Sequence, residues 1–245
     1  MFISLAVRSL RGVVGQKSMY DLYIANKNYS SWSLRPWVLM RELKIACREH
    51  LVPFGDETSW QSYRKISPAG KVPCLVDGDI VVWESLAIIE YLAERHAGVW
   101  PAQGGARAWA RSAAAEMHAG FGELRGRCPM SCGVRVRLHE FPAALERDIA
   151  RLGALWEDGL RRFGGPYLAG EVFTAVDAFY APVAFRIQSY GLTLDPVSVA
   201  YADRLLNTRS MREWYGDALK ETLRDQPHDE EIAQVGRVVE DLRAR

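Results

Sequence analysis

Two neighbouring stretches decide the fold of this chain: Ser67-Pro68-Ala69-Gly70-Lys71-Val72-Pro73-Cys74-Leu75-Val76-Asp77-Gly78, and Val82-Trp83-Glu84-Ser85-Leu86-Ala87-Ile88-Ile89-Glu90-Tyr91-Leu92. They predict, in order, a loop, a strand, a turn, a strand and a helix that runs to about His96. Asp77-Gly78 is a hairpin signal between two short apolar runs. Pro73 is tolerable as the first residue of a strand, where its missing N–H costs no ladder bond.

The same residues predict a binding edge for a small peptide. A Val72-Pro73 bond in a tight bend favours the cis form, which would turn the backbone N–H and C=O of Val72 outward to pair with an extended ligand. Glu84-Ser85 opens a helix, and a helix start offers free N–H groups and a positive dipole end that suit a carboxylate. A backbone ladder beside an anion site is what a peptide with a free α-carboxylate needs.

In order and spacing, these motifs resemble the glutathione transferase superfamily, over about residues 19 to 235. The resemblance implies that Val72 and Pro73 hold the cysteinyl backbone of glutathione, and that Glu84 and Ser85 hold its γ-glutamyl end. Lys71 would pair with the glycine carboxylate, unless it is only a solvated surface lysine. The resemblance also implies glutathione as a cosubstrate, a role in detoxification and a homodimer.

Bulk composition excludes several classes of protein. With 49% hydrophobic and 25% charged residues, the 245-residue chain has enough apolar side chains for a core, and its net charge of +1 gives no basic surface for nucleic acid. No apolar run is long enough to span a membrane. Four cysteines are too few for a disulfide scaffold, which favours a cytoplasmic location.

The first part of the chain predicts a thioredoxin-like α/β domain over residues 19–100. A strand at 19–25, a helix to about Leu43 and a strand at 48–54 imply parallel pairing through a right-handed crossover. Ser33 is expected to cap the helix, with Pro36 in its first turn. Residues 1–18 are expected to be an extension outside the fold, although their apolar and arginine-rich composition also suits an organelle transit peptide.

After a turn-rich linker, strand signals nearly vanish, and residues 104–235 predict an all-α domain. Helices are expected over 106–127 and 138–163. Thr174 and Asp177 form a capping box for a helix to about Tyr190, and one or two more helices follow over 201–220. Residues 230–245 are expected to be a charged amphipathic tail, of which 236–245 lie beyond the domain.

The run Tyr29-Ser30-Ser31-Trp32-Ser33-Leu34-Arg35 carries the candidate catalytic residues. It resembles the zeta-class run Ser-Ser-Cys-x-x-Arg, which implies that Ser30 activates the thiol, with Ser31 beside it. A free thiol has a pKa of about 8.5, and a hydroxyl donor that lowered it by ~2 units would supply about 2.7 kcal/mol. The alternative is that either serine only caps the helix. Trp32 replaces the zeta cysteine and excludes disulfide chemistry there, while Tyr29 is expected to line the cleft.

The second substrate is expected between the domains, under the helix 106–127. Candidate contacts are Met117, His118, Phe121 and Arg125, of which Arg125 could meet an anionic acceptor. The alternative places Met117 and Phe121 in the core, since periodicity cannot separate a cleft from a core. No metal site is expected, because Cys128 and Cys132 lack a full ligand set.

Together these observations predict a glutathione transferase that acts on a small electrophile. Two alternatives stay open. One is a maleylacetoacetate isomerase, in which glutathione adds to a cis double bond of the substrate and leaves after rotation; the other is a non-catalytic binding or regulatory protein that kept the fold.

Overall fold

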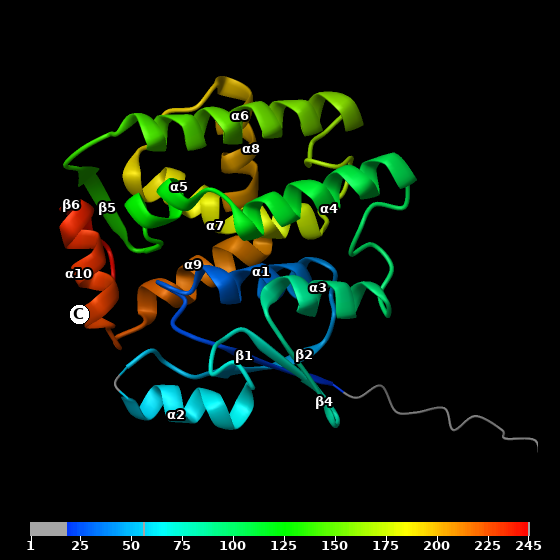
Figure 1. The fold of residues 1–245 in the computed structure, drawn as a ribbon, viewed down its shortest axis with the longest axis horizontal. Coiled ribbons are helices and arrows are strands. Elements are labelled where there is room, and N and C mark those ends of the chain that lie inside the picture. The colour runs from blue at the N-terminus through cyan, green and yellow to red at the C-terminus, as the bar shows by residue number, and fades with distance from the viewer. Residues whose placement is uncertain (1–18, 56, 245) are drawn as a thin grey trace, which may run out of the picture.

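The computed structural model describes residues 19–55 and 57–244, and the predicted extension at residues 1–18 lies outside them. A small sheet with its helices forms one end of the molecule, and a larger group of helices forms the other (Figure 1). The sheet has the strand order β2-β1-β3-β4. This is the α/β domain followed by a helical region that the sequence predicts.

The α/β half follows the predicted order of elements. Its elements are β1 (Tyr20–Ile24), α1 (Ser31–Glu42), β2 (Cys47–Leu51), α2 (Glu57–Ile66), β3 (Cys74–Asp77), β4 (Ile80–Trp83) and α3 (Ser85–Ala93). β1 pairs parallel to β2 and antiparallel to β3, which pairs antiparallel to β4. Gly78 has φ +59° at the hairpin turn, and the Val72-Pro73 bond is cis, as predicted.

Helix α1 begins two residues before the expected cap at Ser33. The carbonyl of Asn26 accepts the N–H groups of Tyr29 and Ser30, so the chain already turns there, and Ser30 is the cap residue. Ser33 therefore lies inside the helix, where its hydroxyl accepts the N–H of Ala25 at 3.3 Å. Pro36 lies past the first turn, which also corrects the prediction.

The helical half departs from the prediction at two places. Its helices are α4 (Gly104–Ala119), α5 (Gly122–Arg127), α6 (Ala143–Phe163), α7 (Ala175–Tyr190), α8 (Pro196–Leu206), α9 (Arg209–Lys220) and α10 (Gln226–Val235). The helix expected over 106–127 is broken, because Gly120 is extended and Phe121 has φ +54°. The helix expected from Leu138 begins only at Ala143, since the residues before it form a strand.

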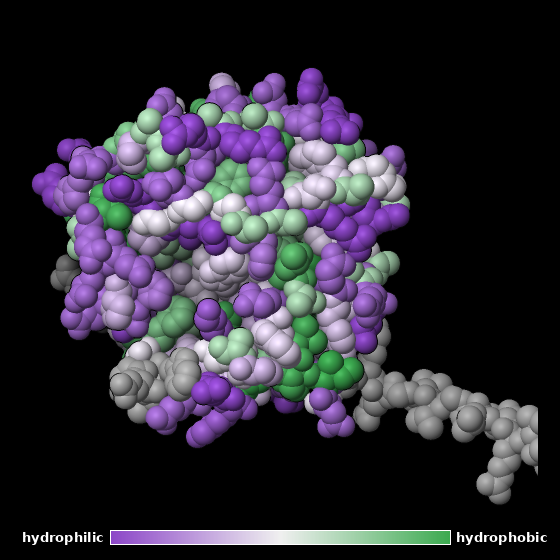
Figure 2. Space-filling model, viewed as in Figure 1, coloured by the Kyte–Doolittle hydropathy of each residue, from purple (hydrophilic) through white to green (hydrophobic). Residues whose placement is uncertain are grey.

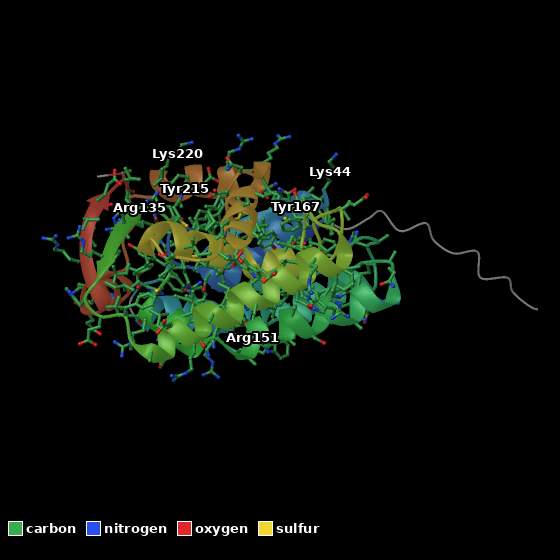
Figure 3. All side chains as sticks on the ribbon, turned by 90° about the horizontal axis from the view of Figure 1, so that it is seen from above. Lys44, Arg135, Arg151, Tyr167, Tyr215 and Lys220 are labelled. Carbon is green, nitrogen blue, oxygen red and sulfur yellow. The ribbon has the colours of Figure 1, made fainter. Side chains whose placement is uncertain are left out.

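A two-stranded sheet joins β5 (Val134–Leu138) to β6 (Gly236–Asp241). The sequence did not predict it, and residues 230–245, expected to be an amphipathic tail, instead contain the end of α10 and this strand. Val134 and Val136 are buried on one face of β5, so buried and more exposed side chains alternate along this strand. The partner strand of β5 lies about a hundred residues away in the chain. Arg135 of β5 reaches toward Tyr215 of α9, with Nη2 3.4 Å from the hydroxyl (Figure 3).

One apolar core continues through both halves. Trp37 of α1 meets Trp214 of α9 edge-on, with 5.0 Å between ring centroids, and α1 packs along α7. The predicted capping box is present at the start of α7, where Asp177 accepts the N–H of Thr174 at 2.9 Å. Among the described residues, no helix is long and apolar enough to cross a membrane.

Candidate functional site

Two adjoining cavities lie where the loop after β1 meets the loop before β3. The larger cavity has a volume of about 540 Å³ and reaches α7 and α10, and the smaller one, about 290 Å³, reaches the start of α3. Trp32, Lys71 and Val72 line both. The two cavities together therefore form an elongated site along one backbone edge.

The predicted peptide-binding residues are gathered at the smaller cavity. Pro73 and Glu84 line it together with Lys71 and Val72. Glu84 has φ +69° directly before α3, which tilts this residue out of the helix. Ser85 is fully buried and lines neither cavity, and within the described part of the chain its hydroxyl has no hydrogen-bond partner.

Ser30 and Ser31 both line the larger cavity. The hydroxyls of Ser30 and Ser33 are 2.7 Å apart and hydrogen-bonded. No side-chain hydrogen bond of Ser31 is found among the residues that the structure describes. Neither serine makes a side-chain cap hydrogen bond to α1. Ser30 occupies the cap position, but its hydroxyl does not accept a backbone N–H of the helix. The interpretation of these hydroxyls as simple helix caps is therefore not supported.

Tyr29 lines the larger cavity with its ring, as expected, but its hydroxyl is engaged elsewhere. It donates to Asp229 at 3.1 Å and accepts from Arg243 at 2.9 Å. Burial raises the pKa of Tyr29 to about 12. This hydroxyl is consequently a poor source of a proton at neutral pH.

Of the four residues proposed for the second substrate, Arg125 alone lines the larger cavity. Met117 and Phe121 are buried in the core, where the alternative interpretation placed them. The His118 ring contacts the Trp32 ring edge-on, with 5.2 Å between the ring centroids. His118 therefore packs against the side of Trp32 and does not itself line the cavity. Burial and the nearby Arg35 lower its pKa.

Trp32, in the place of a cysteine, lies on a buried arginine. The guanidinium carbon of Arg35 is 4.0 Å from the Trp32 ring centroid and 4.9 Å from that of Phe179. Burial, with Arg186 and Arg125 nearby, lowers the pKa of Arg35 to about 9. Arg35 thus adds positive charge behind Trp32, which lines both cavities.

Sequence reasoning missed several residues of the larger cavity: Phe54, Gly55, Tyr63, Gly70, Pro129, Met130, Arg186, His228 and Glu231. Arg186 left a signal, since it is a charged residue in the apolar run of α7 and is 4% exposed. Its Nε donates to the carbonyl of Cys128 at 2.7 Å, and burial lowers its pKa to about 10. The local sequence around His228 and Glu231 gave no signal of a role at the site, because α10 reaches the cavity only through the tertiary fold.

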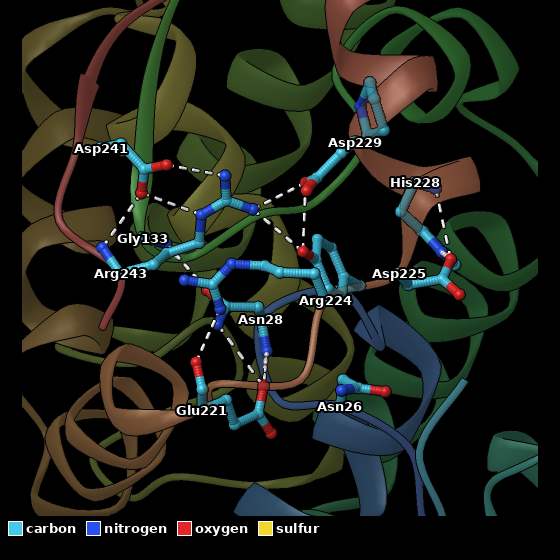
Figure 4. Close-up of polar contacts among 12 residues, drawn as sticks. Asn26, Asn28, Gly133, Glu221, Arg224, Asp225, His228, Asp229, Asp241 and Arg243 are labelled. Carbon is cyan, nitrogen blue, oxygen red and sulfur yellow. Dashed lines mark hydrogen bonds and ion pairs between the residues drawn. The ribbon is translucent and has the colours of Figure 1, made fainter. Parts of the chain in front are cut away.

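Residues after α9 close the larger cavity through a polar network (Figure 4). Arg243 bonds Asp229 at 2.6 Å and Asp241 at 2.8 Å, and so ties α10 to the end of β6. Glu221 accepts the backbone N–H groups of Lys27 at 2.6 Å and Asn28 at 3.1 Å. The loop that carries Ser30 is therefore positioned by the C-terminal segment. No group of metal-ligating side chains occurs in residues 19–55 and 57–244.

Known proteins share the fold and parts of the sequence. The chain is 28% identical to a probable maleylacetoacetate isomerase of Caenorhabditis elegans over 71% of this chain and 82% of that protein. It is 42% identical to a dichloromethane dehalogenase of Methylorubrum extorquens, but over only 26% of this chain and 24% of that protein.

Among solved structures, a glutathione transferase homologue from Burkholderia with bound glutathione superposes with a TM-score of 0.60 at 20% identity, covering 81% of this chain and 97% of that one. A Tau class glutathione S-transferase from mango gives a TM-score of 0.63 at 20% identity, covering 82% and 94%. Residues 25–100 match the family model "Glutathione S-transferase, N-terminal domain", and residues 135–215 match "Glutathione S-transferase, C-terminal domain". These spans cover more than half of the chain, which therefore belongs to the glutathione S-transferase family.

Proposed function

We propose that this chain transfers glutathione to a small electrophile that carries an anionic group. The observation that carries the proposal is the continuous edge at Lys71 and Val72, which leads on one side to Glu84 and on the other to the serines of α1. Glutathione laid along this edge places its γ-glutamyl end in the smaller cavity and its sulfur at Ser30 and Ser31.

Ser30 is the proposed hydroxyl that stabilises the thiolate. A hydroxyl donates one proton and accepts two, and Ser33 already accepts from the N–H of Ala25. Ser30 donates to Ser33 across their 2.7 Å contact. When glutathione is bound, the Ser30 hydroxyl turns its proton to the sulfur, and Ser33 can then donate to Ser30 in its place. Ser31, without a side-chain partner among the described residues, is the alternative donor.

The preference for an anionic acceptor follows from Arg125 and Arg186. Both line the larger cavity, and no carboxylate forms an ion pair with either within the described residues. Guanidinium groups held in a low-dielectric wall bind carboxylates strongly, often through two parallel hydrogen bonds. The two guanidinium groups line the same cavity as Ser30 and Ser31, so their charge favours a thiolate there.

Glutathione-dependent isomerisation of maleylacetoacetate is the second candidate. A dicarboxylate suits the cationic cavity, and probable maleylacetoacetate isomerases of Caenorhabditis elegans and Vibrio cholerae are relatives. Trp32, in the place of the zeta cysteine, is the residue that separates this chain from that pattern.

We also propose a homodimer in the cytoplasm. Ile80, Val81 and Trp83 of the edge strand β4 are 47%, 37% and 41% exposed. They form an apolar patch over β4 at the lower right of the molecule (Figure 2). An apolar edge strand is otherwise a site for aggregation, and a second copy would cover it. All four cysteines are free, which suits a reducing compartment.

The test combines binding and ionisation. Glutathione binding is measured by titration calorimetry, and turnover is measured with a chloronitrobenzene and with maleylacetone. Ser30→Ala should leave glutathione affinity within about fivefold but move the near-ultraviolet titration of the bound thiolate to higher pH, because a neutral hydrogen bond contributes about 1 kcal/mol. Glu84→Ala should weaken binding instead. Binding without turnover of any electrophile would mark a non-catalytic protein, and absence of glutathione binding would refute the proposal.

A further inference from the structure

We propose that His228, held by Asp225, is the group that takes the proton from the glutathione thiol. This inference rests on the proposed function, because it assigns a catalytic base to the same cavity. It concerns α10, which lies beyond residue 215, where the match to the family's C-terminal domain ends.

The Asp225 side chain fixes the imidazole in one orientation. Nδ1 of His228 lies 2.5 Å from Oδ2 of Asp225, whose side chain is 5% exposed. An ionised carboxylate only accepts hydrogen bonds, so Nδ1 carries the hydrogen and Nε2 carries the lone pair. Nε2 has no hydrogen-bond partner in the described part of the chain, and the ring lines the larger cavity. The lone pair is thus free to accept a proton there.

Aromatic packing holds the ring in place. His228 stacks on Tyr29 with 5.2 Å between centroids and on Phe54 with 4.7 Å. Asp225 also caps α10 by accepting the backbone N–H of His228 at 3.3 Å. The base and its orienting carboxylate are therefore built into one helix start, and a base oriented by a third group is the arrangement that nucleophile activation requires.

Charged and titratable groups face His228 from several elements. Its own helix start contributes Asp225, Asp229 and Glu231. Arg243, two residues beyond the end of β6, is engaged by Asp229 and Asp241. The loop after β1 contributes the neutral phenol of Tyr29 and α2 that of Tyr63, both with raised pKa values. The cations of the cavity wall are Lys71, Arg125 and Arg186. They favour the thiolate that forms as the imidazole accepts the proton.

The proton transfer is a balanced step. The S–H bond of glutathione breaks, its proton forms an N–H bond at Nε2, and the electron pair stays on sulfur. The thiolate then forms an S–C bond to the acceptor. When the acceptor is a halide, the leaving group departs with the bonding pair and the imidazolium releases its proton to solvent. When the acceptor is a double bond, the imidazolium returns the proton to the adduct.

The experiment is a pH profile of kcat/KM for the wild-type chain, His228→Gln and Asp225→Asn, with His139→Gln as the control at an exposed histidine. Asn caps helices as well as Asp does, so Asp225→Asn keeps α10 while removing the charge that supports the imidazolium. Loss of a general base costs about 100-fold. We expect His228→Gln to lose about that factor near pH 6.5 and little near pH 9.5, where glutathione ionises in solution without help. Asp225→Asn should lose less, and His139→Gln nothing.

A second measurement separates this inference from the proposed function. Binding of S-methylglutathione, which has no thiol proton, should be unchanged in His228→Gln. A wild-type chain that binds no glutathione would sink the proposed function itself. If the wild type is active and the pH profile of His228→Gln runs parallel to the wild-type profile at every pH, the inference about His228 is overturned while the proposed function stands. A variant with a raised KM and an unchanged profile would show that His228 binds the glycine carboxylate instead, which also overturns it.

Discussion

Replacing Asp177 with alanine should destabilise the protein far more than a helix cap explains. Besides the N–H of Thr174, its carboxylate accepts the N–H of Leu168 at 3.0 Å and the hydroxyl of Tyr201 at 2.8 Å. The side chain is fully buried at the start of α7, the helix that carries Arg186 to the cavity. Thr174→Ala removes only part of the cap and should cost about 1 kcal/mol.

The free energy of unfolding that Asp177→Ala loses depends on pH, and the burial of Asp177 determines the direction of that dependence. Three buried donors left without an acceptor cost at least ~1 kcal/mol each, so Asp177→Ala should lose about 3 kcal/mol near pH 7. Burial raises the pKa of Asp177 from 3.8 to about 6. Since the folded state then binds the proton more tightly than the unfolded state, this group adds stability as pH falls through that window and loses it as pH rises. The loss in Asp177→Ala should therefore grow by about 2 kcal/mol between pH 7 and about pH 4.5.

Urea unfolding of the wild type, Thr174→Ala and Asp177→Ala at the two pH values measures both effects. Asp203→Ala, at an exposed position on α8, is the control for loss of a carboxylate. The reasoning fails if Asp177→Ala loses no more stability than Thr174→Ala, or if the difference between Asp177→Ala and the wild type narrows at the lower pH.

Four further outcomes are expected. Gly159→Ala should destabilise by about 1–3 kcal/mol in thermal or urea melts, because the new methyl would lie 2.4 Å from a tryptophan ring carbon and 2.6 Å from a backbone carbonyl. Gly216→Ala, with open space around it, should stabilise by about 0.5–1 kcal/mol. Trp83→Glu should convert a dimer to a monomer in light scattering, and an unchanged mass would place the interface elsewhere. Arg186→Met should lower kcat/KM at least about tenfold for an electrophile with a carboxylate but not for a neutral one, the discrimination that a lost charge-assisted hydrogen bond gives. Arg137→Met, at an exposed position of β5, should change neither value.

Local sequence signals were sufficient to predict that the residues of the proposed peptide edge lie together. Lys71, Val72, Pro73 and Glu84 lie close together in the chain, and the proline, the hairpin turn and the helix start each fix their own backbone. The capping box at Thr174 succeeded for the same reason, since both partners belong to one turn of helix. Predictions failed where the deciding contact was distant, as with β5, whose alternation is readable but whose partner strand follows α10.

The larger cavity has two walls. One, at Lys71 and Val72, has a backbone fixed by local sequence; the other, at the loop after β1 and α10, is fixed by contacts that are distant in the chain. Lys27 and Asn28 have no strong local preference, and their N–H groups find an acceptor only in Glu221, almost two hundred residues later. Tyr29 is fixed likewise by Asp229 and Arg243. The family motifs therefore define the proposed glutathione edge at Val72, whereas the segment after α9 sets the position of the loop that carries Ser30 and brings His228 to the same cavity. A change in this segment should alter proton transfer and acceptor choice while the peptide edge at Val72 stays intact, because the two walls share no hydrogen bond that we find within the described residues.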